Sequence, residues 1–336
     1  MIVTLTPNPS VDRTVEVDSL ERGSVVRARS GRVDPGGKGI NVARALVAHG
    51  HAVTAVLPCG GSEGKQLTGL LDAARIDVVG VPIAGSIRAN ITVVEPDGTV
   101  TKLNEPGPHL SPDEAASLNE ATVLTARAAQ WLVACGSLPL GVADDFYARV
   151  IEQLSPTAIK IAIDTSGSAL LKSLPAAPDV IKPNIEELSD AAGIPVRTLG
   201  DALTAALKLR EQGSFTVIAS LGADGALYVD DSVVRHAEVS VDDPRSSVGA
   251  GDALLAGFLA HGGHGVEAFR RGVAWAAAAV SLPGSQMPAP ADVDLSKVRL
   301  YERVDVARSL DVSVPVVDRA VHETKRADTD RTLQQP

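Results

Sequence analysis

The chain has 336 residues, a net charge of −10 and 45% hydrophobic residues. This length and composition are typical of a globular protein with a buried core, built as one large domain or two small ones. The excess of 41 acidic over 31 basic residues argues against nucleic-acid binding through bulk charge. An anionic substrate would therefore need locally placed positive charge.

The two cysteines, Cys59 and Cys135, have neither metal-ligand spacing nor the number that a disulfide framework requires. Residues 1–12 lack the basic segment and the long apolar stretch of a signal peptide. The apolar stretches are too short, or too broken by glycine and charge, to span a bilayer. We therefore expect a cytoplasmic protein that binds neither membranes nor nucleic acid.

Short apolar runs alternate with helical patterns along most of the chain. The patterns predict strands at 1–6, 52–58, 78–83, 130–135, 160–164, 180–184 and 216–220, and helices at 39–50, 64–75, 142–154, 166–173, 185–192 and 199–212. Because strands and helices alternate, the fold class is expected to be α/β, with a mostly parallel central sheet and helices on both of its faces.

Two segments break this alternation and one segment ends it. Residues 12–34 and 86–107 alternate polar with apolar positions, and the second contains a Pro-Asp-Gly turn at 96–98. They predict antiparallel strands, from about 12–34 and 86–105, that form a small lid sheet apart from the main one. Residues 311–336 lose periodicity and become polar, which predicts a flexible tail. Residues 1–310 would then form one domain, whose lid strands come from two separate parts of the sequence.

The segment VGAGDALLAGF (248–258) places a glycine-rich turn before an acid and an apolar helical run. The start of a helix exposes N–H groups and the positive end of the helix dipole, so it attracts anions. Asp252 would lie in the first turn of this helix. Taken alone, the pattern is more typical of an acid that merely stabilises a helix start.

A second glycine-rich turn, DPGGKGINVARAL (34–46), also opens into a helix, with Lys38 in the turn and Asn41 near the helix start. Such a turn can hold a phosphate or a sugar, or simply connect a strand to a helix. It does not match the P-loop pattern, and the near match at 60–67 has Gln66 in place of Ser or Thr. No G-x-G-x-x-G follows the first strand, which disfavours a nicotinamide oxidoreductase.

Two further motifs follow predicted strands, at the edge where an open α/β sheet binds ligands. They are KPNIEEL (182–188) and SLGADGAL (220–227). Asn184 and Glu187 are three residues apart, so both could face one site from a first helical turn, and the carboxylate could hold Mg²⁺ directly or through water. The alternatives are a first-turn acid at Glu187 and a hairpin turn at Gly222 and Gly225.

In combination, these motifs resemble those of the ribokinase-like (PfkB) sugar kinases. The resemblance covers about residues 1–295 and rests on segments in the family's order: Thr6-Pro7-Asn8-Pro9 with Asp12, Gly36–Asn41, Gly136–Pro139, Lys182–Glu187, Ser220–Gly222 and Val248–Asp252. It implies a three-layer α/β/α ribokinase-like fold with a β-sheet lid, the use of ATP and Mg²⁺, and a homodimer that clasps through its lid sheets.

The resemblance also implies a role for each motif residue. Asp252 would be the general base for the sugar hydroxyl, with Gly249, Ala250 and Gly251 as the anion hole for the transferred phosphoryl group. Glu187 would belong to the Mg²⁺-linked motif. The sugar phosphate would be bound by Asp12, Arg27, Gly37, Lys38, Asn41, Arg88 and Ser137. The ATP would be bound by Lys182, Asn184, Ser220, Leu221, Gly222, Ala223, Asp224 and Gly225.

The TPNPSVD start, the lysine in GGKG and the RAN at 88–90 resemble the phosphosugar branch of the family. A sugar phosphate carries about two negative charges at neutral pH, so we expect Lys38 and Arg88, and after them Arg27, to offset them; the alternative for each is a solvated surface charge. Members of the branch that act on fructose 6-phosphate tend to read Gly-Gly-Gly-Gly where this chain reads Gly36-Gly37-Lys38-Gly39. This difference, together with the resemblance of TKLNEPGP (101–108), favours fructose 1-phosphate as substrate.

The implied reaction is phosphorylation of the 6-hydroxyl of fructose 1-phosphate, which gives fructose 1,6-bisphosphate and ADP. Kinases of the same branch that act on fructose 6-phosphate or tagatose 6-phosphate are the alternatives, and Leu140 departs from the family pattern near the expected sugar. A non-catalytic sugar-phosphate sensor is disfavoured because Asp252 and its neighbouring glycines are intact.

Overall fold

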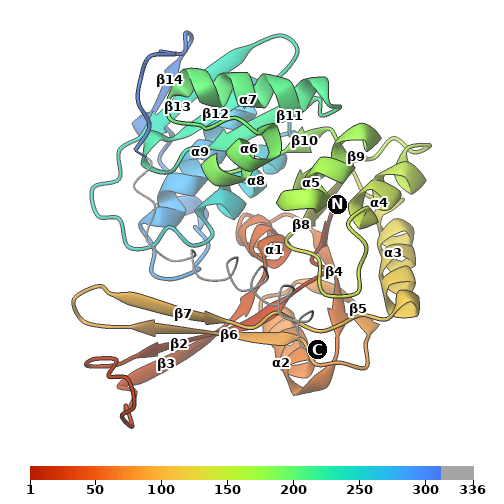
Figure 1. Cartoon of the computed structure of the whole chain (residues 1–336), viewed down its shortest axis with the longest axis vertical. Helices are drawn as coiled ribbons and strands as arrows, with labels where there is room; N and C mark the ends of the chain where they lie inside the picture. The colour runs from red at the N-terminus through yellow and green to blue at the C-terminus, as the bar shows by residue number, and fades with distance from the viewer. Residues whose placement is uncertain (312–336) are drawn as a thin grey trace, which may run out of the picture.

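The structure is a computed structural model, and it describes residues 1–311 of the chain (Figure 1). Its large sheet contains the strands β1 (Ile2–Leu5), β4 (Val53–Cys59), β5 (Asp77–Pro82), β8 (Trp131–Cys135), β9 (Lys160–Asp164), β10 (Val180–Ile181), β11 (Thr216–Ser220), β12 (Ala226–Val229), β13 (Val234–Val239) and β14 (Val298–Tyr301). They lie in the order β14-β13-β12-β11-β10-β9-β8-β1-β4-β5.

The strands from β5 to β11 in this order are parallel, which confirms the predicted parallel centre. The strands β12, β13 and β14 add an antiparallel edge that the sequence analysis did not predict. The turn at 221–225 joins β11 to its antiparallel neighbour β12, so its glycines do lie in a strand-to-strand turn.

Helices cover both faces of this sheet, as expected. One face is covered by α1 (Lys38–Ala48), α2 (Gly61–Ala73), α8 (Ala250–Ala260) and α9 (Gly265–Val280). The other is covered by α3 (Pro112–Ala126), α4 (Phe146–Leu154), α5 (Gly167–Ser173), α6 (Ile185–Ala192) and α7 (Leu199–Glu211). Short 3₁₀ helices are η1 (Leu174–Ala176), η2 (Gly222–Asp224), η3 (Pro290–Asp292) and η4 (Leu295–Lys297).

The face of α1 toward the sheet shows how the sequence directs this layering. Ile40, Ala43 and Leu46 recur at helical spacing and are completely buried in the core beneath α1 and α8. Removing a buried leucine side chain from such a core costs about 2–5 kcal/mol. The apolar periodicity therefore fixes which side of α1 meets the sheet, and with it where the first turn of the helix lies.

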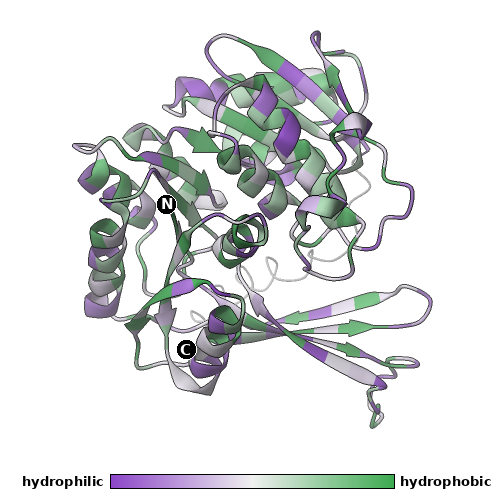
Figure 2. Ribbon diagram, turned by 180° about the vertical axis from the view of Figure 1, so that it is seen from behind, coloured by the Kyte–Doolittle hydropathy of each residue, from purple (hydrophilic) through white to green (hydrophobic). Residues whose placement is uncertain are grey.

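A smaller sheet projects from the body (Figures 1 and 2). It consists of β2 (Ser10–Glu16), β3 (Ser30–Gly36), β6 (Arg88–Val94) and β7 (Val100–Asn104), in the order β3-β2-β6-β7. The predicted second, smaller sheet is confirmed, and we keep the name lid for it; the prediction of wholly antiparallel pairing is wrong, because β2 pairs with β6 in parallel. The strands β2 and β6 follow β1 and β5, which are parallel in the main sheet, and so they leave the same edge in the same direction.

The lid sheet has one polar and one largely apolar face. Directly paired residues of neighbouring strands project to the same face. One cross-strand row is polar and consists of Asp34, Asp12, Asn90 and Asn104. The adjacent row projects to the opposite face and consists of Val33, Arg13, Ile91 and Leu103. Figure 2 shows this alternation of polar and apolar residues along the lid strands.

The described part of the chain ends on the body of the protein. The backbone N–H of Asp311 donates a hydrogen bond to the carboxylate of Asp224, 2.7 Å away. Residues 312–336, most of the predicted tail, lie outside the described residues. Within residues 1–311, no helix is both long and apolar enough to cross a bilayer. The cytoplasmic location stays a prediction.

Candidate active site

The site lies where the order of the parallel strands reverses. From β1 the chain adds β4 and β5 on one side and β8, β9, β10 and β11 on the other. The carboxyl ends of the strands at such a switch point form the ligand-binding crevice of open α/β sheets. Asn8 and Ser137 follow β1 and β8, Asp164 ends β9, and Lys182 follows β10. The fold therefore brings polar side chains from four neighbouring strands to one edge.

Asp252 is held at the start of α8 by a turn that requires glycine. Gly249 has a φ of 80° and precedes the first residue of the helix. A residue with a side chain would be strained at this φ, and its Cβ atom would lie 2.6 Å from Cε of Met287, which would have to move. Asp252 then lies in the first turn, with 7% of its surface exposed.

A hydrogen bond joins Asp252 to the other glycine-rich helix start. Nδ2 of Asn41 donates to Oδ2 of Asp252 at 2.9 Å. α1 can approach this closely because Gly37, with a φ of 121°, precedes it, and because a side chain at Gly39 would collide with Thr6 and the Leu5 carbonyl. The two glycine-rich motifs thus meet at the Asp252 carboxylate, although Asn41 and Asp252 are 211 residues apart in the sequence.

The environment of Asp252 makes it a weaker acid than an exposed aspartate. Burial and the negative charge of Asp164 raise its pKa to about 6, and Lys182, Asn41 and Lys38 oppose the rise. A carboxylate whose pKa lies just below neutral pH is ionised under physiological conditions yet can accept a proton. The geometry and the pKa therefore suit a general base.

A buried ion network lies beside this carboxylate. Asp164 is completely buried, with Nζ of Lys38 at 2.8 Å from one carboxylate oxygen and Nζ of Lys182 at 3.1 Å from the other. Burial raises the pKa of Asp164, but the two ammonium groups outweigh it and hold this pKa below its usual value. Lys182 also lies against the turn at 249–251, which is the predicted anion hole: a Cβ atom placed on Gly251 would be 3.1 Å from Nζ of Lys182.

Asp164 is a site residue that the sequence analysis missed. It is the last residue of the predicted strand 160–164, at the edge where the sheet binds ligands. That position was the available signal, but an acid after an apolar strand is otherwise unremarkable in sequence. The structure identifies it through its burial between two lysines.

Lys38 forms ion pairs that the sequence analysis did not predict. The sequence analysis expects it at the phosphate of the sugar, whereas its ion-pair partners are Asp164 and Glu187, the latter 3.0 Å away. Burial lowers the pKa of Lys38, but these two carboxylates outweigh it and the pKa is raised above the usual value. A role of Lys38 at the substrate phosphate stays a prediction.

Three other predicted sugar residues, Asp12, Arg88 and Ser137, belong to a group of hydrogen-bonded side chains at the base of the lid. Asp12 accepts hydrogen bonds from Ser10 at 2.7 Å and from Nδ2 of Asn90 at 2.9 Å. Nη2 of Arg88 donates to the Asn8 carbonyl at 3.1 Å, and Nδ2 of Asn8 donates to Oγ of Ser137 at 3.4 Å. Asn8 and Asn90 are additions that the sequence analysis quoted within motifs without assigning a role.

Three polar atoms in this group are buried without a protein partner. They are Oδ1 of Asn8, Nε of Arg88 and Oδ1 of Asn90. Buried polar atoms are nearly always hydrogen-bonded, so such atoms indicate that water or a ligand completes their bonding. Gly36 and Gly37 border the same region, where a side chain on Gly36 would collide with Asp12. The arrangement suits a polyhydroxylated ligand with an anionic group.

Arg27 is the predicted sugar residue that the structure does not join to the others. It is exposed in the loop 17–29 between β2 and β3, and within residues 1–311 its side chain has no hydrogen bond or ion pair. Its predicted contact with a phosphate stays a prediction.

Asn184 and Glu187, predicted for the ATP and the Mg²⁺-linked motif, form a reciprocal cap at the start of α6. Oδ1 of Asn184 accepts from the Glu187 N–H at 2.8 Å, and Oε2 of Glu187 accepts from the Asn184 N–H at 2.9 Å. This cap leaves Oε1 of Glu187 for Lys38. Ser220, at the end of β11, pairs with Asn184 through a parallel β-bridge.

In the turn after Ser220, the side chains of Leu221 and Asp224 are taken up by contacts within the protein. Leu221 is completely buried, and the Asp224 carboxylate accepts hydrogen bonds from Arg308 at 2.9 Å and from the Asp311 N–H. Gly222 and Ala223 are exposed. Gly225 has a φ of 81°, and a side chain there would collide with the Ala237 carbonyl. The side chains of Leu221 and Asp224 therefore serve the fold.

Carboxylates at the site fit a divalent cation only in part. Within residues 1–311, no cluster of three or more His, Cys, Asp or Glu side chains could hold a metal ion. Asp164 and Glu187 nevertheless converge on one cationic group, the Lys38 ammonium. Oxygen ligands of this kind suit Mg²⁺, which commonly takes one or two carboxylates and completes its shell with water and phosphate oxygens.

The chain is similar to several known proteins. The family model of pfkB family carbohydrate kinases matches residues 6–292. A 1-phosphofructokinase of Haloferax volcanii is 40% identical over 300 residues, which are 87% of this chain and 95% of that protein. An ATP-dependent 6-phosphofructokinase isozyme 2 of Mycobacterium tuberculosis is 34% identical over 94% of this chain and 95% of that protein. A crystal structure of phosphofructokinase-2 from Escherichia coli superposes with a TM-score of 0.82 and 32% identity over 87% of this chain and 96% of that one.

Proposed function

Because the chain belongs to the pfkB family of carbohydrate kinases, we propose that it transfers the γ-phosphoryl group of ATP to the 6-hydroxyl of fructose 1-phosphate. The products are fructose 1,6-bisphosphate and ADP. The observation that carries the proposal is the buried Asp252, which is hydrogen-bonded to Asn41 and lies directly after the Gly249 turn.

Each residue of the site has a separate role in the proposed phosphoryl transfer. Asp252 accepts the proton of the 6-hydroxyl as the new O–P bond forms and the bond from phosphorus to the ADP oxygen breaks. Nδ2 of Asn41 donates to Oδ2 of Asp252 and holds the carboxylate in place. The N–H groups of the turn at 249–251 and the nearby Lys182 ammonium stabilise the negative charge on the transferred group.

The cation and the sugar would occupy opposite sides of this carboxylate. Asp164 and Glu187 would hold Mg²⁺, which neutralises charge on the phosphates when it is bound. Asp12, Asn90 and Arg88 would hold the sugar phosphate beneath the lid. Several relatives are 1-phosphofructokinases, at 30–40% identity, and a 6-phosphofructokinase at 34% lies within the same range, so the choice of fructose 1-phosphate rests on the sequence motifs around Lys38 and residues 101–108.

A coupled ATP-turnover assay tests the proposal. It would compare fructose 1-phosphate, fructose 6-phosphate, tagatose 6-phosphate, fructose and ribose, each with and without Mg²⁺. We expect the highest kcat/KM for fructose 1-phosphate with Mg²⁺. A preference for a 6-phosphate would keep the mechanism and change the substrate, and turnover of unphosphorylated sugar alone would contradict a site built for a phosphosugar.

The pKa of Asp252 predicts how the rate depends on pH. The base must be ionised to accept a proton, and its pKa is raised to about 6 by burial and by Asp164. We therefore expect kcat/KM for the sugar to be level above about pH 7 and to fall about tenfold per pH unit below pH 6. Measuring kcat/KM from pH 5 to 8 checks this, and a rate that stays level down to pH 5 would contradict it.

We also propose that the lid sheets of two chains pair in a homodimer. The face of the lid that carries Val33, Ile91 and Leu103 leaves these side chains 36%, 38% and 58% exposed. Exposed apolar side chains grouped on one face of a sheet are typical of an interaction surface. Asp12 lies on the opposite face, so pairing here leaves the polar face free for the sugar.

A charge on the apolar face is expected to separate the dimer. Replacing Leu103 by lysine would place two like charges in the symmetric interface, so the mass in solution should fall from dimer to monomer. Val100 is the matched control, because it is exposed on the same strand but projects to the polar face. Light scattering after gel filtration would decide, and dimer loss in Val100→Lys but not in Leu103→Lys would place the interface on the other face.

A further inference from the structure

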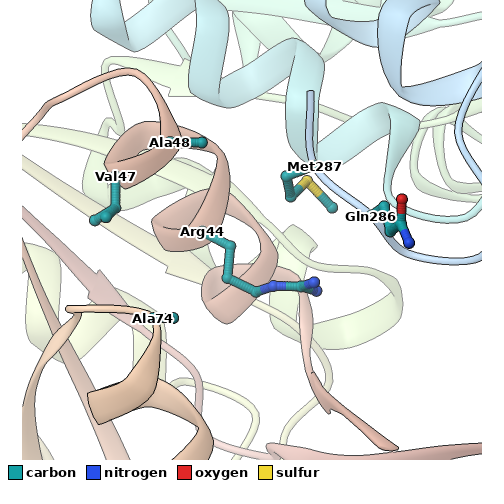
Figure 3. Close-up of a pocket in the computed structure, with 6 residues that line it drawn as sticks. All are labelled: Arg44, Val47, Ala48, Ala74, Gln286 and Met287. Carbon is teal, nitrogen blue, oxygen red and sulfur yellow. The ribbon is translucent and has the colours of Figure 1, made fainter. Parts of the chain in front are cut away.

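Arg44 contacts three separate parts of the site from the middle of α1. Its Nη1 donates to Oδ1 of Asn41 at 3.2 Å, to the Ser285 carbonyl at 3.0 Å and to the Pro35 carbonyl at 3.5 Å. Figure 3 shows the side chain extending from α1 toward the segment that carries Gln286 and Met287. No motif in the sequence analysis assigned this arginine a role.

The contact with Asn41 decides which way the asparagine amide faces. An amide has a donor end and an acceptor end, whereas a guanidinium can only donate. Oδ1 of Asn41 must therefore face Arg44, which leaves Nδ2 as the group that meets Asp252 at 2.9 Å. With the amide reversed, Oδ1 would face an ionised carboxylate and the two acceptors would repel each other.

Asp252 alone does not fix this orientation. When ionised it requires a donor from Asn41, but when protonated it can itself donate to Oδ1 of the amide. During proton transfer from the sugar the carboxylate passes from the first state to the second. A permanently charged donor on the far side of Asn41 keeps the amide in one orientation through that change, and Arg44 is such a donor.

The same guanidinium supports the segment behind the anion-hole turn. Ser285 is nearly buried and Met287, two residues further on, packs against Gly249 so closely that a Cβ atom there would lie 2.6 Å from Cε. Pro35 is the last residue but one of β3, at the base of the lid. Arg44 thus connects the lid, the partner of the base and the backing of the anion hole.

We propose that Arg44 is a positioning residue for the phosphoryl transfer, which acts by fixing the Asn41 amide against Asp252. The inference rests on the proposed role of Asp252 as the base. Arg44 itself touches neither Asp252 nor the turn at 249–251 through any hydrogen bond within residues 1–311. Its effect on the rate must therefore pass through Asn41 or through its other contacts, the carbonyls of Ser285 and Pro35, and the route through Asn41 can be separated from the rest.

A double-mutant cycle separates them. Arg44→Met removes the donors at similar length, and the cavity that Arg44 lines with Val47, Ala48, Ala74, Gln286 and Met287 gives the new side chain room. We expect Arg44→Met to lower kcat about 10²-fold with little change in the KM for ATP. In the Asn41→Ala background the same substitution should change kcat by less than about twofold, because the group it orients is gone.

Equal losses in both backgrounds would overturn the inference, since they would show that Arg44 acts through Ser285, through Pro35 or through the fold. A kcat unchanged in Arg44→Met would overturn it as well. If Arg44→Met does not fold, Arg44→Lys tests the same contact in the opposite sense: it keeps one donor for Oδ1 of Asn41, so its kcat should stay close to that of the unaltered protein, and a loss as large as about 10²-fold would overturn the inference. Arg270→Met is the matched control, because Arg270 also binds a backbone carbonyl, that of Leu295 at 2.9 Å, from a neighbouring helix, and its kcat should equal that of the unaltered protein.

The cycle is measured with the sugar phosphate that the unaltered protein turns over fastest, so a different substrate does not affect it. The role of Asp252 is tested separately by its own substitution. If Asp252→Asn retains full turnover, the proposed base is wrong. If Asp252→Asn is inactive and the cycle shows equal losses, the base stands and the role of Arg44 fails.

Discussion

Replacing Asp252 by asparagine is expected to lower kcat by about 10²–10⁴-fold, the usual contribution of a general base. The substitution keeps the size of the side chain but removes the group that accepts the proton. Because Asp252 is buried at the start of α8 and hydrogen-bonded to Asn41, an amide can occupy the same space. We therefore expect the fold, and the affinity for the sugar phosphate in calorimetry, to be close to those of the unaltered protein.

The matched control is Asp201→Asn. Asp201 is also a first-turn acid, in the cap of α7, where its carboxylate accepts from the Thr198 N–H at 2.9 Å. If Asp252 only stabilised the start of its helix, the two variants would show similar small losses of stability and both would keep their kcat. A large fall in kcat for Asp252→Asn alone identifies the base, and equal rates in the two variants would contradict the assignment.

The elements that the sequence predicted well are those whose pattern is local. The helix at α1 follows from apolar residues at helical spacing, and Ile40, Ala43 and Leu46 are indeed buried together. Helix α3 was left out, although Ser111 and Glu114 form a capping box that its sequence contains. The parallel pairing of β2 with β6 was predicted wrongly, because pairing direction depends on where the two preceding strands lie in the sheet.

In the candidate site, too, features set by neighbouring residues could be predicted, and contacts between distant segments could not. The glycine-rich turns could be located because each needs residues without a side chain at fixed positions, as at Gly249. Which charges meet could not be found in this way. The ion pairs of Lys38 with Asp164 and Glu187 were not predicted, because they depend on three different segments that end at the same place. Asp164 acquires its importance only from that meeting.

Asp164→Asn is expected to cause the largest loss of stability among substitutions in the site. The carboxylate is completely buried and lies between the Lys38 and Lys182 ammonium groups, so its removal leaves Lys182, which is 4% exposed, without its ion-pair partner. Removing one member of a buried ion pair costs about 3–5 kcal/mol, because the remaining charge keeps its desolvation penalty. Chemical unfolding at pH 7 measures this difference as a lower free energy of unfolding.

The difference in the free energy of unfolding between the two proteins is expected not to change with pH over a wide range. The lysines hold the pKa of Asp164 below its usual value, so the folded protein keeps this carboxylate ionised until the pH falls below the range in which an unfolded aspartate titrates. The stabilisation is therefore fully present from pH 7 to about pH 5, and the difference between the two proteins should be constant there. Asp242→Asn is the control, because Asp242 pairs with Lys297 at 3.4 Å while 87% exposed, and it should cost less than about 1 kcal/mol. A loss in Asp164→Asn as small as this control would show that the network contributes nothing to the fold.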